Sequence, residues 1–383
     1  MARRALIVGA GIGGLSAAIA LRQAGWDVRV FERSTSLREL GFGVALAPNA
    51  MAALGELGIA DIVLARACEL VRGELRRMDG TVLKRAAVPR RILGGPFVVA
   101  MRPALYGALL DAVGRETVTP GSDATGFTIS GGRVTLHLTS GARVDGDLLV
   151  GADGVHSVIR RQLHPAEPPP RPSRIVSVRG AVDRVLAHLG GADAVYYLGP
   201  GLESAFIRAS DTGIYWFLAV AEELIKGDSA AAVLAHMAPR FDDTFRRITT
   251  ATSELRYDGV LVDRDPLPSW GTSVVTLIGD AAHPMLPQTG QGAAQAIVDA
   301  VTLGQLLTGR ADIETTLRAF EAERQPKTAA LVRQGRRTAR FMRIQHPLAC
   351  AAREALIRVF PMKPLMKLYA RINRRAGTEV GVG

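Results

Sequence analysis

Glycines near the N-terminus follow a spacing that suits the binding of a phosphate-bearing cofactor. The stretch GAGIGG gives Gly9, Gly11 and Gly14 the pattern G-x-G-x-x-G, with Gly13 beside the last of them. In such a pattern the first glycine permits a tight turn, the second lets a pyrophosphate approach the backbone, and the third lets a helix pack closely on a strand. Glycines alone indicate such a site only weakly, so the neighbouring elements decide the interpretation.

The neighbouring segments form the strand–helix–strand unit that this spacing requires. Residues 3–8 predict a buried strand, residues 15–24 a helix rich in small residues, and residues 27–31 a second strand. Glu32 closes the second strand, where a carboxylate accepts hydrogen bonds from ribose hydroxyls. Because an acid there disfavours a 2′-phosphate, the site suits FAD or NAD rather than NADP.

A second motif, GDAAHPMLPQTGQGAAQ at 279–295, follows the apolar run SVVTLI. Asp280 ends that predicted strand, and Pro287 and the glycines precede a predicted helix. Free N–H groups at a helix start stabilise negative charge. Taken alone, the motif would rather indicate an Asp helix cap followed by a glycine-rich loop.

A third motif, DLLVGADGVHSVIRRQL at 147–163, predicts a strand, a turn and a helix. Asp153 in the turn is interpreted mainly as structural, because an Asp in a tight turn satisfies its own backbone. The three motifs together resemble the flavin-dependent aromatic hydroxylase family, the single-component FAD monooxygenases typified by para-hydroxybenzoate and salicylate hydroxylases. The resemblance extends from residue 2 to about residue 340 and includes the stretches 32–50, 101–110 and 319–326.

The resemblance implies an α/β fold with a Rossmann-like FAD-binding domain, an interleaved and mostly antiparallel β-sheet substrate domain, and C-terminal helices. The sequence also predicts helices over 48–65 and 102–113, and a hairpin of 72–76 and 81–88 with its turn at Asp79–Gly80. The proline-rich stretch 165–173 is a predicted crossing between the two domains. The expected division is a discontinuous FAD-binding domain of 1–70, 98–165 and 268–340, a substrate domain of 71–97 and 174–267, and a C-terminal helical segment of 341–383.

The resemblance also implies which residues contact FAD. It places Asp280 on the ribityl chain, the segment from Pro287 to Ala293 beside the flavin ring, and Arg102 on the pyrophosphate. The full expected set is Gly9, Gly11, Gly13, Gly14, Glu32, Arg33, Val44, Ala45, Arg102, Ala124, Asp280, Pro287, Gly290, Gly292 and Ala293. This chain departs from many relatives in having Ala294 in place of an Asn, and Val298 where a Glu is common, so its flavin-edge environment is expected to differ slightly.

The implied activity is that of an FAD-dependent monooxygenase with NADPH or NADH as co-substrate. NAD(P)H reduces FAD, O₂ adds to give a flavin hydroperoxide, and its distal oxygen hydroxylates a small aromatic or polycyclic metabolite. Because the cofactor performs this chemistry, no metal is expected and no catalytic side chain is assigned. His283 is interpreted as a packing or capping residue. Three alternatives remain open: an epoxidase of an isoprenoid or polyketide, a flavin-binding reductase, and a flavoprotein without turnover.

The substrate domain carries weaker signals. Arg179, Arg208 and Tyr215 are candidate substrate contacts, and Arg208 would suit an anionic group. Apolar stripes on strands are more often core than pocket. Further side chains that could line the sheet over the flavin are Tyr196, Phe206, Trp216 and Phe217.

Composition excludes several classes of protein. The 383 residues are 48% hydrophobic, and no apolar run is long enough to span a membrane, so a cytoplasmic enzyme is expected. Cys68 and Cys350 have neither disulfide-framework nor zinc-site spacing. The net charge is +11, and basic residues gather between Lys327 and Arg375 without aromatic interleaving. We therefore expect no nucleic-acid partner, a C-terminal segment that packs on the protein rather than on a membrane, and a monomer or homodimer.

Overall fold

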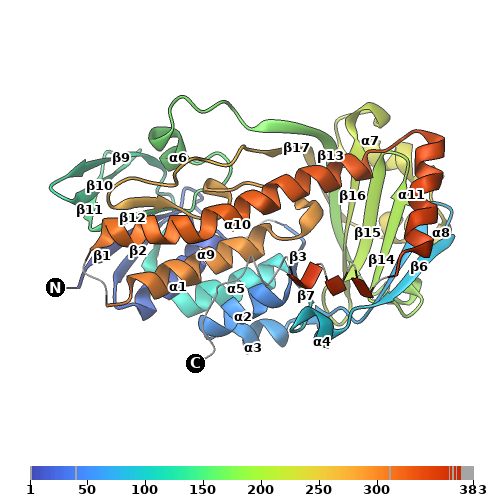
Figure 1. Cartoon of the computed structure of the whole chain (residues 1–383), viewed down its shortest axis with the longest axis horizontal. Helices are drawn as coiled ribbons and strands as arrows, with labels where there is room; N and C mark the ends of the chain where they lie inside the picture. The colour runs from blue at the N-terminus through green and yellow to red at the C-terminus, as the bar shows by residue number, and fades with distance from the viewer. Residues whose placement is uncertain are drawn as a thin grey trace.

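The computed structural model describes residues 2–38, 41–309, 312–361, 363–364, 366–367 and 369–371. Parts of the stretch 32–50 and of the segment 341–383 therefore lie outside the described residues. Figure 1 shows a parallel sheet with its helices at one end of the molecule and a large, mostly antiparallel sheet at the other. This arrangement confirms the predicted α/β fold.

A five-stranded sheet with the order β18-β12-β1-β2-β8 organises the first half. Its members are β1 (Arg4–Val8), β2 (Asp27–Phe31), β8 (Val118–Thr119), β12 (Leu148–Gly151) and β18 (Val275–Leu277). All its neighbouring strands are parallel. The run Ala5–Val8 is buried, as expected for a strand covered on both faces. Because parallel strands end at one edge, the turns after β1, β12 and β18 meet there.

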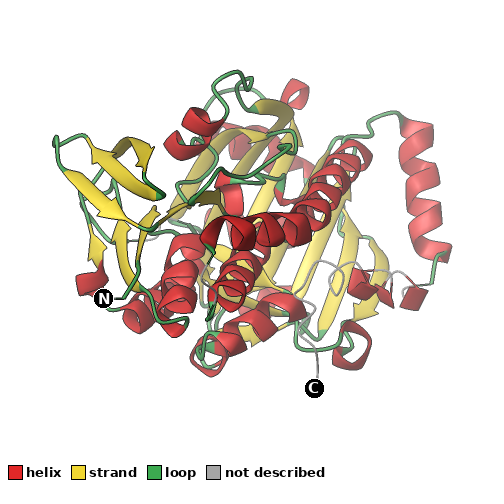
Figure 2. Ribbon diagram, turned by 60° about the vertical axis from the view of Figure 1, so that its left-hand side comes forward, coloured by secondary structure: helices red, strands yellow, loops and turns green. Residues whose placement is uncertain are grey.

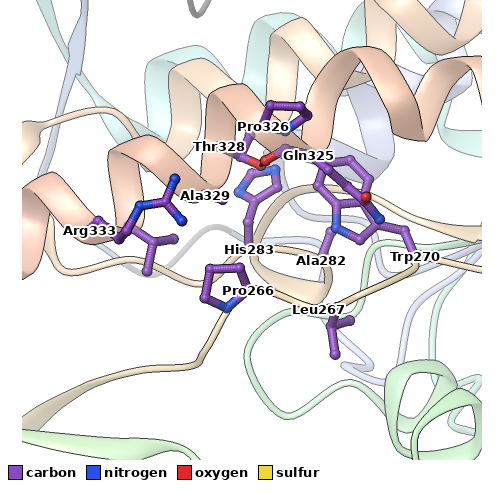
Figure 3. A pocket seen from close by; sticks show the side chains of 11 residues that line it. Pro266, Leu267, Trp270, Ala282, His283, Gln325, Pro326, Thr328, Ala329 and Arg333 are labelled. Atoms are coloured by element: carbon purple, nitrogen blue, oxygen red, sulfur yellow. The ribbon is translucent and has the colours of Figure 1, made fainter.

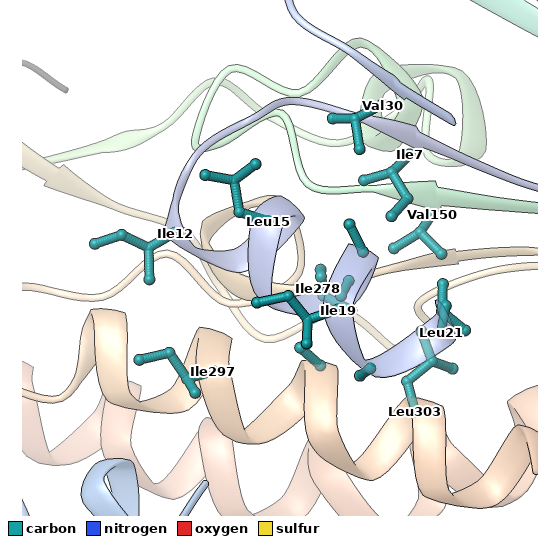
Figure 4. Close-up of a cluster of buried hydrophobic side chains, with 14 of the residues drawn as sticks. Ile7, Ile12, Leu15, Ile19, Leu21, Val30, Val150, Ile278, Ile297 and Leu303 are labelled. Carbon is teal, nitrogen blue, oxygen red and sulfur yellow. The ribbon is translucent and has the colours of Figure 1, made fainter. Parts of the chain in front are cut away.

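Helices rich in small residues cover this sheet, with one helix on its strands and two packed on that helix. They are α1 (Ile12–Gln23), α5 (Arg102–Val113) and α9 (Gly292–Leu307). A Cβ added to Gly304 of α9 would lie 2.7 Å from the Cβ of Ala20 in α1, so the two helices approach at backbone distance. Figure 4 shows Leu15 and Ile19 of α1 between the strands and Ile297 of α9. This packing fixes the starts of α1 and α9 side by side.

Two smaller sheets extend this half. One is antiparallel, made of β9 (Ala124–Ser130), β10 (Arg133–Leu138) and β11 (Arg143–Gly146), and α6 (Val158–Leu163) lies against β9. The other has the order β3-β7-β4, from β3 (Gly43–Leu46), β4 (Ala67–Glu69) and β7 (Val98–Met101). The helix expected from Pro48 onward is two helices, α2 (Pro48–Glu56) and α3 (Ala60–Leu64), because the backbone turns at Gly58 with a φ of +76°. A short helix, α4 (Arg90–Leu93), precedes β7.

A seven-stranded sheet with the order β17-β13-β16-β15-β14-β5-β6 organises the second half. Its members are β5 (Arg72–Arg77), β6 (Val82–Ala87), β13 (Arg171–Asp183), β14 (Ala194–Gly199), β15 (Leu202–Arg208), β16 (Gly213–Ala221) and β17 (Glu254–Asp263). All neighbours are antiparallel except β5 and β14. The predicted hairpin around Asp79–Gly80 is confirmed, and β13 begins inside the proline-rich stretch.

One face of this sheet is a closed aromatic core. Side chains of β14, β15 and β16 alternate, and one set packs under α7 (Ala230–Met237) and α8 (Asp243–Thr250). Phe206, Trp216 and Phe245 are fully buried in that core. The opposite face looks toward β3 and β7.

The long helix α10 (Ile313–Met342) runs across both halves, and α11 (Pro347–Val359) stands at the far end of the large sheet (Figure 1). Figure 2 shows α10 in front of the strands, with the β9–β11 sheet at the end of the molecule away from α11. Among the described residues, no helix has both the length and the apolar character needed to cross a membrane.

Candidate active site

The glycine loop after β1 has three distinct constraints. Gly9 has a φ of +101°, and a Cβ there would lie 2.5 Å from the carbonyl oxygen of Ala152. A Cβ on Gly14 would overlap the carbonyl oxygen of Gly9, whereas one on Gly11 would meet nothing within 4 Å. A Cβ added to Gly13 would lie 3.3 Å from the Ala296 methyl group of α9. The loop is thus tightly held by its protein neighbours and open at Gly11, where a phosphate group would need access.

Glu32 is hydrogen-bonded to the backbone of this loop. Its carboxylate accepts hydrogen bonds from the backbone N–H of Ala10 and of Ser34, each at 2.8 Å. Helix α1 begins just beyond with Gly11 at its N-cap and no side-chain cap. An uncapped helix start presents N–H groups and a positive dipole end to an anion. Arg33 is exposed next to Glu32.

The turn after β18, Gly279–Ala281, presents Asp280 and is called the GD turn below. Gly279 has a φ of +57°, and its N–H donates to Asp299 Oδ2 at 2.9 Å. Asp280 keeps an accessible surface, yet loss of solvent raises the pKa of its carboxyl, while His283 and Arg102 oppose that shift. An accessible but poorly solvated carboxylate indicates a recessed surface rather than an open one.

The start of α9 lies beside the GD turn and β3. A 3₁₀ turn, Pro287–Thr289, leads through Gly290 to the helix, which has Gln291 at its N-cap and no side-chain cap. A Cβ on Gly292 would lie 3.9 Å from Asp280 Oδ1, and one on Gly290 would lie 3.7 Å from the Ala45 methyl group. The GD turn, the helix start with Ala293, and strand β3 with Val44 are therefore close neighbours.

These residues fit the chemistry of FAD. The uncapped starts of α1 and α9 offer N–H donors, the open space at Gly11 admits a pyrophosphate, and Asp280 offers an acceptor for sugar hydroxyls. Arg102 begins α5, and its side chain passes Gly41, where an added Cβ would lie 2.8 Å from Arg102 Cδ. Ala124 begins β9 and its side chain is buried in the core, so it would contact a ligand through its backbone.

Two motif residues have structural partners. Asp153 accepts a hydrogen bond from the backbone N–H of Val158 at 2.7 Å and one from the Ser157 hydroxyl, so it caps the start of α6. His283 is buried, with its Nε2 2.6 Å from Asp299 Oδ2 and its ring 5.3 Å from that of Trp270. Both contacts agree with the expected structural roles.

A cavity of about 280 Å³ lies behind the GD turn, beside His283 (Figure 3). It is bounded by Trp270 and by residues of α10 such as Gln325 and Arg333. None of its lining residues belongs to the expected FAD set. His283 therefore faces a second recess, separate from the turn that presents Asp280.

A buried polar network beneath the site escaped the sequence analysis. Gln291 Oε1 accepts hydrogen bonds from Asn49 and from Gln295, each at 3.2 Å. Gln295 Oε1 in turn accepts one from Arg324 at 2.6 Å, and Arg324 donates to Asp299 at 2.8 Å. Burial opposes ionisation of Asp299, but His283 and Arg324 outweigh it and lower the pKa of the carboxyl to about 2. Only the fold brings α2, α9 and α10 together here.

Of the three predicted substrate residues, Arg179 and Tyr215 interact with each other, whereas Arg208 bonds within a separate turn. Arg179 makes a bidentate ion pair with Asp258 at 2.6 and 2.7 Å, and it also interacts with Tyr215. Tyr215 lies against β3, where its ring occupies the space that a Cβ on Gly43 would need. Arg208 donates hydrogen bonds within its own turn, to the Ser210 carbonyl at 3.2 Å and to Asp211 at 3.4 Å.

The suggestion that Phe206 and Trp216 line the sheet over the flavin is wrong. Both are fully buried on the opposite face, against α8, because side chains alternate along β15 and β16. Tyr215 and Phe217 have the other parity and pack on the face toward β3 and β7.

Glu203 lies on the same face, and the sequence alone did not single it out as a candidate. Its Oε1 accepts a hydrogen bond from Gln288 Nε2 at 3.3 Å, which joins β15 to the turn before α9. Loss of solvent raises the pKa of the Glu203 carboxyl to about 7, and Gln288 opposes the shift. The single acid of the strand LESAFIR, set among mostly apolar residues, was the available signal.

A model of the family described as "FAD binding domain" matches residues 3–335. The aurachin C monooxygenase/isomerase of Stigmatella aurantiaca is 32% identical over 92% of this chain and 93% of that protein. The 3-hydroxybenzoate 6-hydroxylase 1 of Aquipseudomonas alcaligenes is 32% identical over 92% of each chain. The crystal structure of Klebsiella pneumoniae HpxO complexed with FAD and uric acid superposes with a TM-score of 0.92 at 26% identity, covering 99% of this chain and 98% of that one.

Proposed function

The chain belongs to the FAD binding domain family and, like its single-component relatives, is an FAD-dependent aromatic monooxygenase, and we propose that its substrate is a small aromatic or polycyclic molecule. The proposed reaction consumes one NAD(P)H, one proton and one O₂ for each substrate hydroxylated and releases NAD(P)⁺ and one water. One observation carries the proposal. The strand β3, the GD turn and the start of α9 lie close together, and an aromatic face of the large sheet packs beside them.

The proposed roles of the binding residues follow from their chemistry. Gly11 and the start of α1 would hold the pyrophosphate together with Arg102, and Glu32 would hold the adenosine ribose. Asp280 would accept hydrogen bonds from the ribityl chain. The uncapped start of α9, with Gly292 and Ala293, would stabilise negative charge on the reduced ring. FAD, when bound, supplies hydride acceptance and oxygen activation.

The protein's further contribution is to exclude water and aim the substrate. Tyr215 and Phe217 pack on the face toward β3 and β7, where they would flank a flat substrate. Loss of solvent raises the pKa of Tyr215 and of Glu203, which supports a poorly hydrated site.

We also propose the division into a discontinuous FAD-binding domain and a substrate domain with the boundaries given above. The pairing of β5 with β14 supports it, because residues 72–77 join a sheet whose other strands, apart from β6, lie beyond residue 170. Cytoplasmic location and a monomeric or homodimeric state belong to the same proposal.

The test is isotopic. Purified protein with bound FAD is supplied with NADH or NADPH, ¹⁸O₂ and a panel of phenols, quinolones and polycyclic phenols. We expect at least one product that carries a single ¹⁸O atom and forms in proportion to the NAD(P)H consumed.

Other outcomes would contradict the proposal. NAD(P)H oxidation with stoichiometric hydrogen peroxide and no ¹⁸O incorporation would indicate a reductase. Bound FAD without NAD(P)H oxidation would indicate a flavoprotein without turnover. Incorporation only into isoprenoid or polyketide alkenes would indicate an epoxidase.

A further inference from the structure

The face of the large sheet that looks toward the GD turn carries both aromatic and acidic side chains. Tyr196, Glu203 and Tyr215 come from the adjacent strands β14, β15 and β16. The contact of Gln288 with Glu203 and that of β3 with Tyr215 fix the orientation of this face. Tyr369, from the C-terminal segment, extends it, because it interacts with Tyr196.

This face is accessible to solvent. Tyr196 is 38% exposed, and Glu203 is partly exposed. Yet loss of solvent raises the pKa of both side chains. Surface that is reachable but poorly hydrated is what a ligand of small size would occupy.

Among the described charged groups around this face, none is a cation paired with Glu203. Arg179 is engaged by the bidentate pair with Asp258, which Arg256 also contacts at 3.0 Å. The groups that interact with Glu203 from neighbouring elements are the neutral Gln288 amide and the phenol of Tyr196. No described cation forms a salt bridge with Glu203 within 4.0 Å.

We propose that Glu203 is a specificity-determining residue that accepts a hydrogen bond from the substrate, so that the site selects phenols whose second substituent is cationic or neutral over phenols that carry a carboxylate. The inference rests on the proposed function, since it names the substrate class of the same site. A carboxylate that lacks a cation is repelled by a second carboxylate, whereas a charge-assisted hydrogen bond to a donor strengthens where water is scarce.

The test uses three probes with one ring: 3-hydroxybenzylamine, 3-methylphenol and 3-hydroxybenzoate. Binding to the FAD-loaded protein is followed by the change in flavin absorbance, without NAD(P)H, so no turnover is needed. At a pH of about 8, above the Glu203 pKa of about 7, we expect the amine to bind at least about tenfold more tightly than the benzoate, with 3-methylphenol between them.

Glu203→Gln should reduce the amine-to-benzoate preference to about threefold or less while FAD stays bound. Lowering the pH to about 6 should weaken amine binding to the natural protein, because Glu203 becomes protonated, and should leave the variant unchanged. Glu223→Gln is the matched control, since that carboxylate contacts Gln345 and Arg343 away from the site.

Tighter binding of 3-hydroxybenzoate than of the amine by the natural protein would overturn the proposal. So would an equal effect of Glu203→Gln on all three probes. Either result is independent of the ¹⁸O experiment, because a monooxygenase selective for carboxylates would still incorporate oxygen.

Discussion

Gly11 and Gly14 lie in one loop but meet different neighbours. A Cβ on Gly11 would enter open space, and its φ of −72° suits any residue. A Cβ on Gly14 would overlap the Gly9 backbone, which cannot move aside as a flexible side chain could. At the scale of single residues, we therefore expect Gly11 to serve the ligand and Gly14 to serve the fold.

Gly11→Ala should leave the free energy of unfolding of the cofactor-free protein within about 0.5 kcal/mol of the natural value. The same change should weaken FAD binding at least about tenfold, because the methyl group points where the pyrophosphate would lie. Urea unfolding and fluorescence titration with FAD measure the two effects.

Gly14→Ala is the matched comparison and should destabilise the protein by about 3 kcal/mol through backbone displacement. Equal loss of stability in both variants would show that Gly11 is a structural glycine. Unchanged FAD affinity in Gly11→Ala would place the pyrophosphate elsewhere.

At the scale of elements, Asp299 and Arg324 join α9 to α10. Both side chains are fully buried, and Asp299 also accepts the N–H of Gly279 at the GD turn. The pair therefore ties the turn that presents Asp280 to two helices. A buried carboxylate of this kind is costly to remove, because its partner's charge stays behind.

Asp299→Asn should lower the free energy of unfolding by about 3–5 kcal/mol near neutral pH. The folded pKa of about 2 lies below the usual unfolded value of about 3.9, so this stabilisation is present above pH of about 4. It should fade as pH falls toward about 2, and the difference between the two proteins should shrink accordingly.

Glu323→Gln on the same helix is the control, since its surface pair with Lys327 at 3.2 Å contributes about 0–1 kcal/mol. Urea titrations across the acid range compare the three proteins. A loss below about 1 kcal/mol in Asp299→Asn would contradict the assigned role.

At the scale of the whole molecule, Tyr369 from the C-terminal segment lies beside the start of α9. The Tyr369 ring lies 6.2 Å from that of Phe97, and Gln291 donates a hydrogen bond to its hydroxyl at 3.4 Å. Residues far apart in sequence thereby complete the aromatic surface beside the α9 start. We infer that this segment helps to enclose the substrate.

Tyr369→Ala should weaken 3-methylphenol binding by about three- to tenfold, the loss expected for one aromatic contact. Flavin content should stay unchanged, because none of the proposed FAD residues is altered. Leu348→Ala on α11 is the control, since that side chain is 77% exposed. Unaltered probe affinity in Tyr369→Ala would remove the C-terminal segment from the site.

The sequence by itself determined the family, the FAD cofactor and the order of the main elements. These are local properties: glycine spacing sets a loop, apolar periodicity sets a strand or helix, and Asp280 follows its strand directly. The boundaries of β2 and α5 agree with the predicted segments for the same reason. The predicted helix at 48–65 divided at Gly58 because that glycine takes a positive φ.

Only the tertiary structure decided which side chains face one another. Strand parity places Phe206 and Trp216 in the core and Tyr215 on the face toward β3 and β7, and strand parity cannot be read until the buried face is known. Glu203, Tyr369 and the Asp299–Arg324 pair depend on contacts between segments distant in sequence. Such contacts arise from packing, which no local pattern of residues specifies.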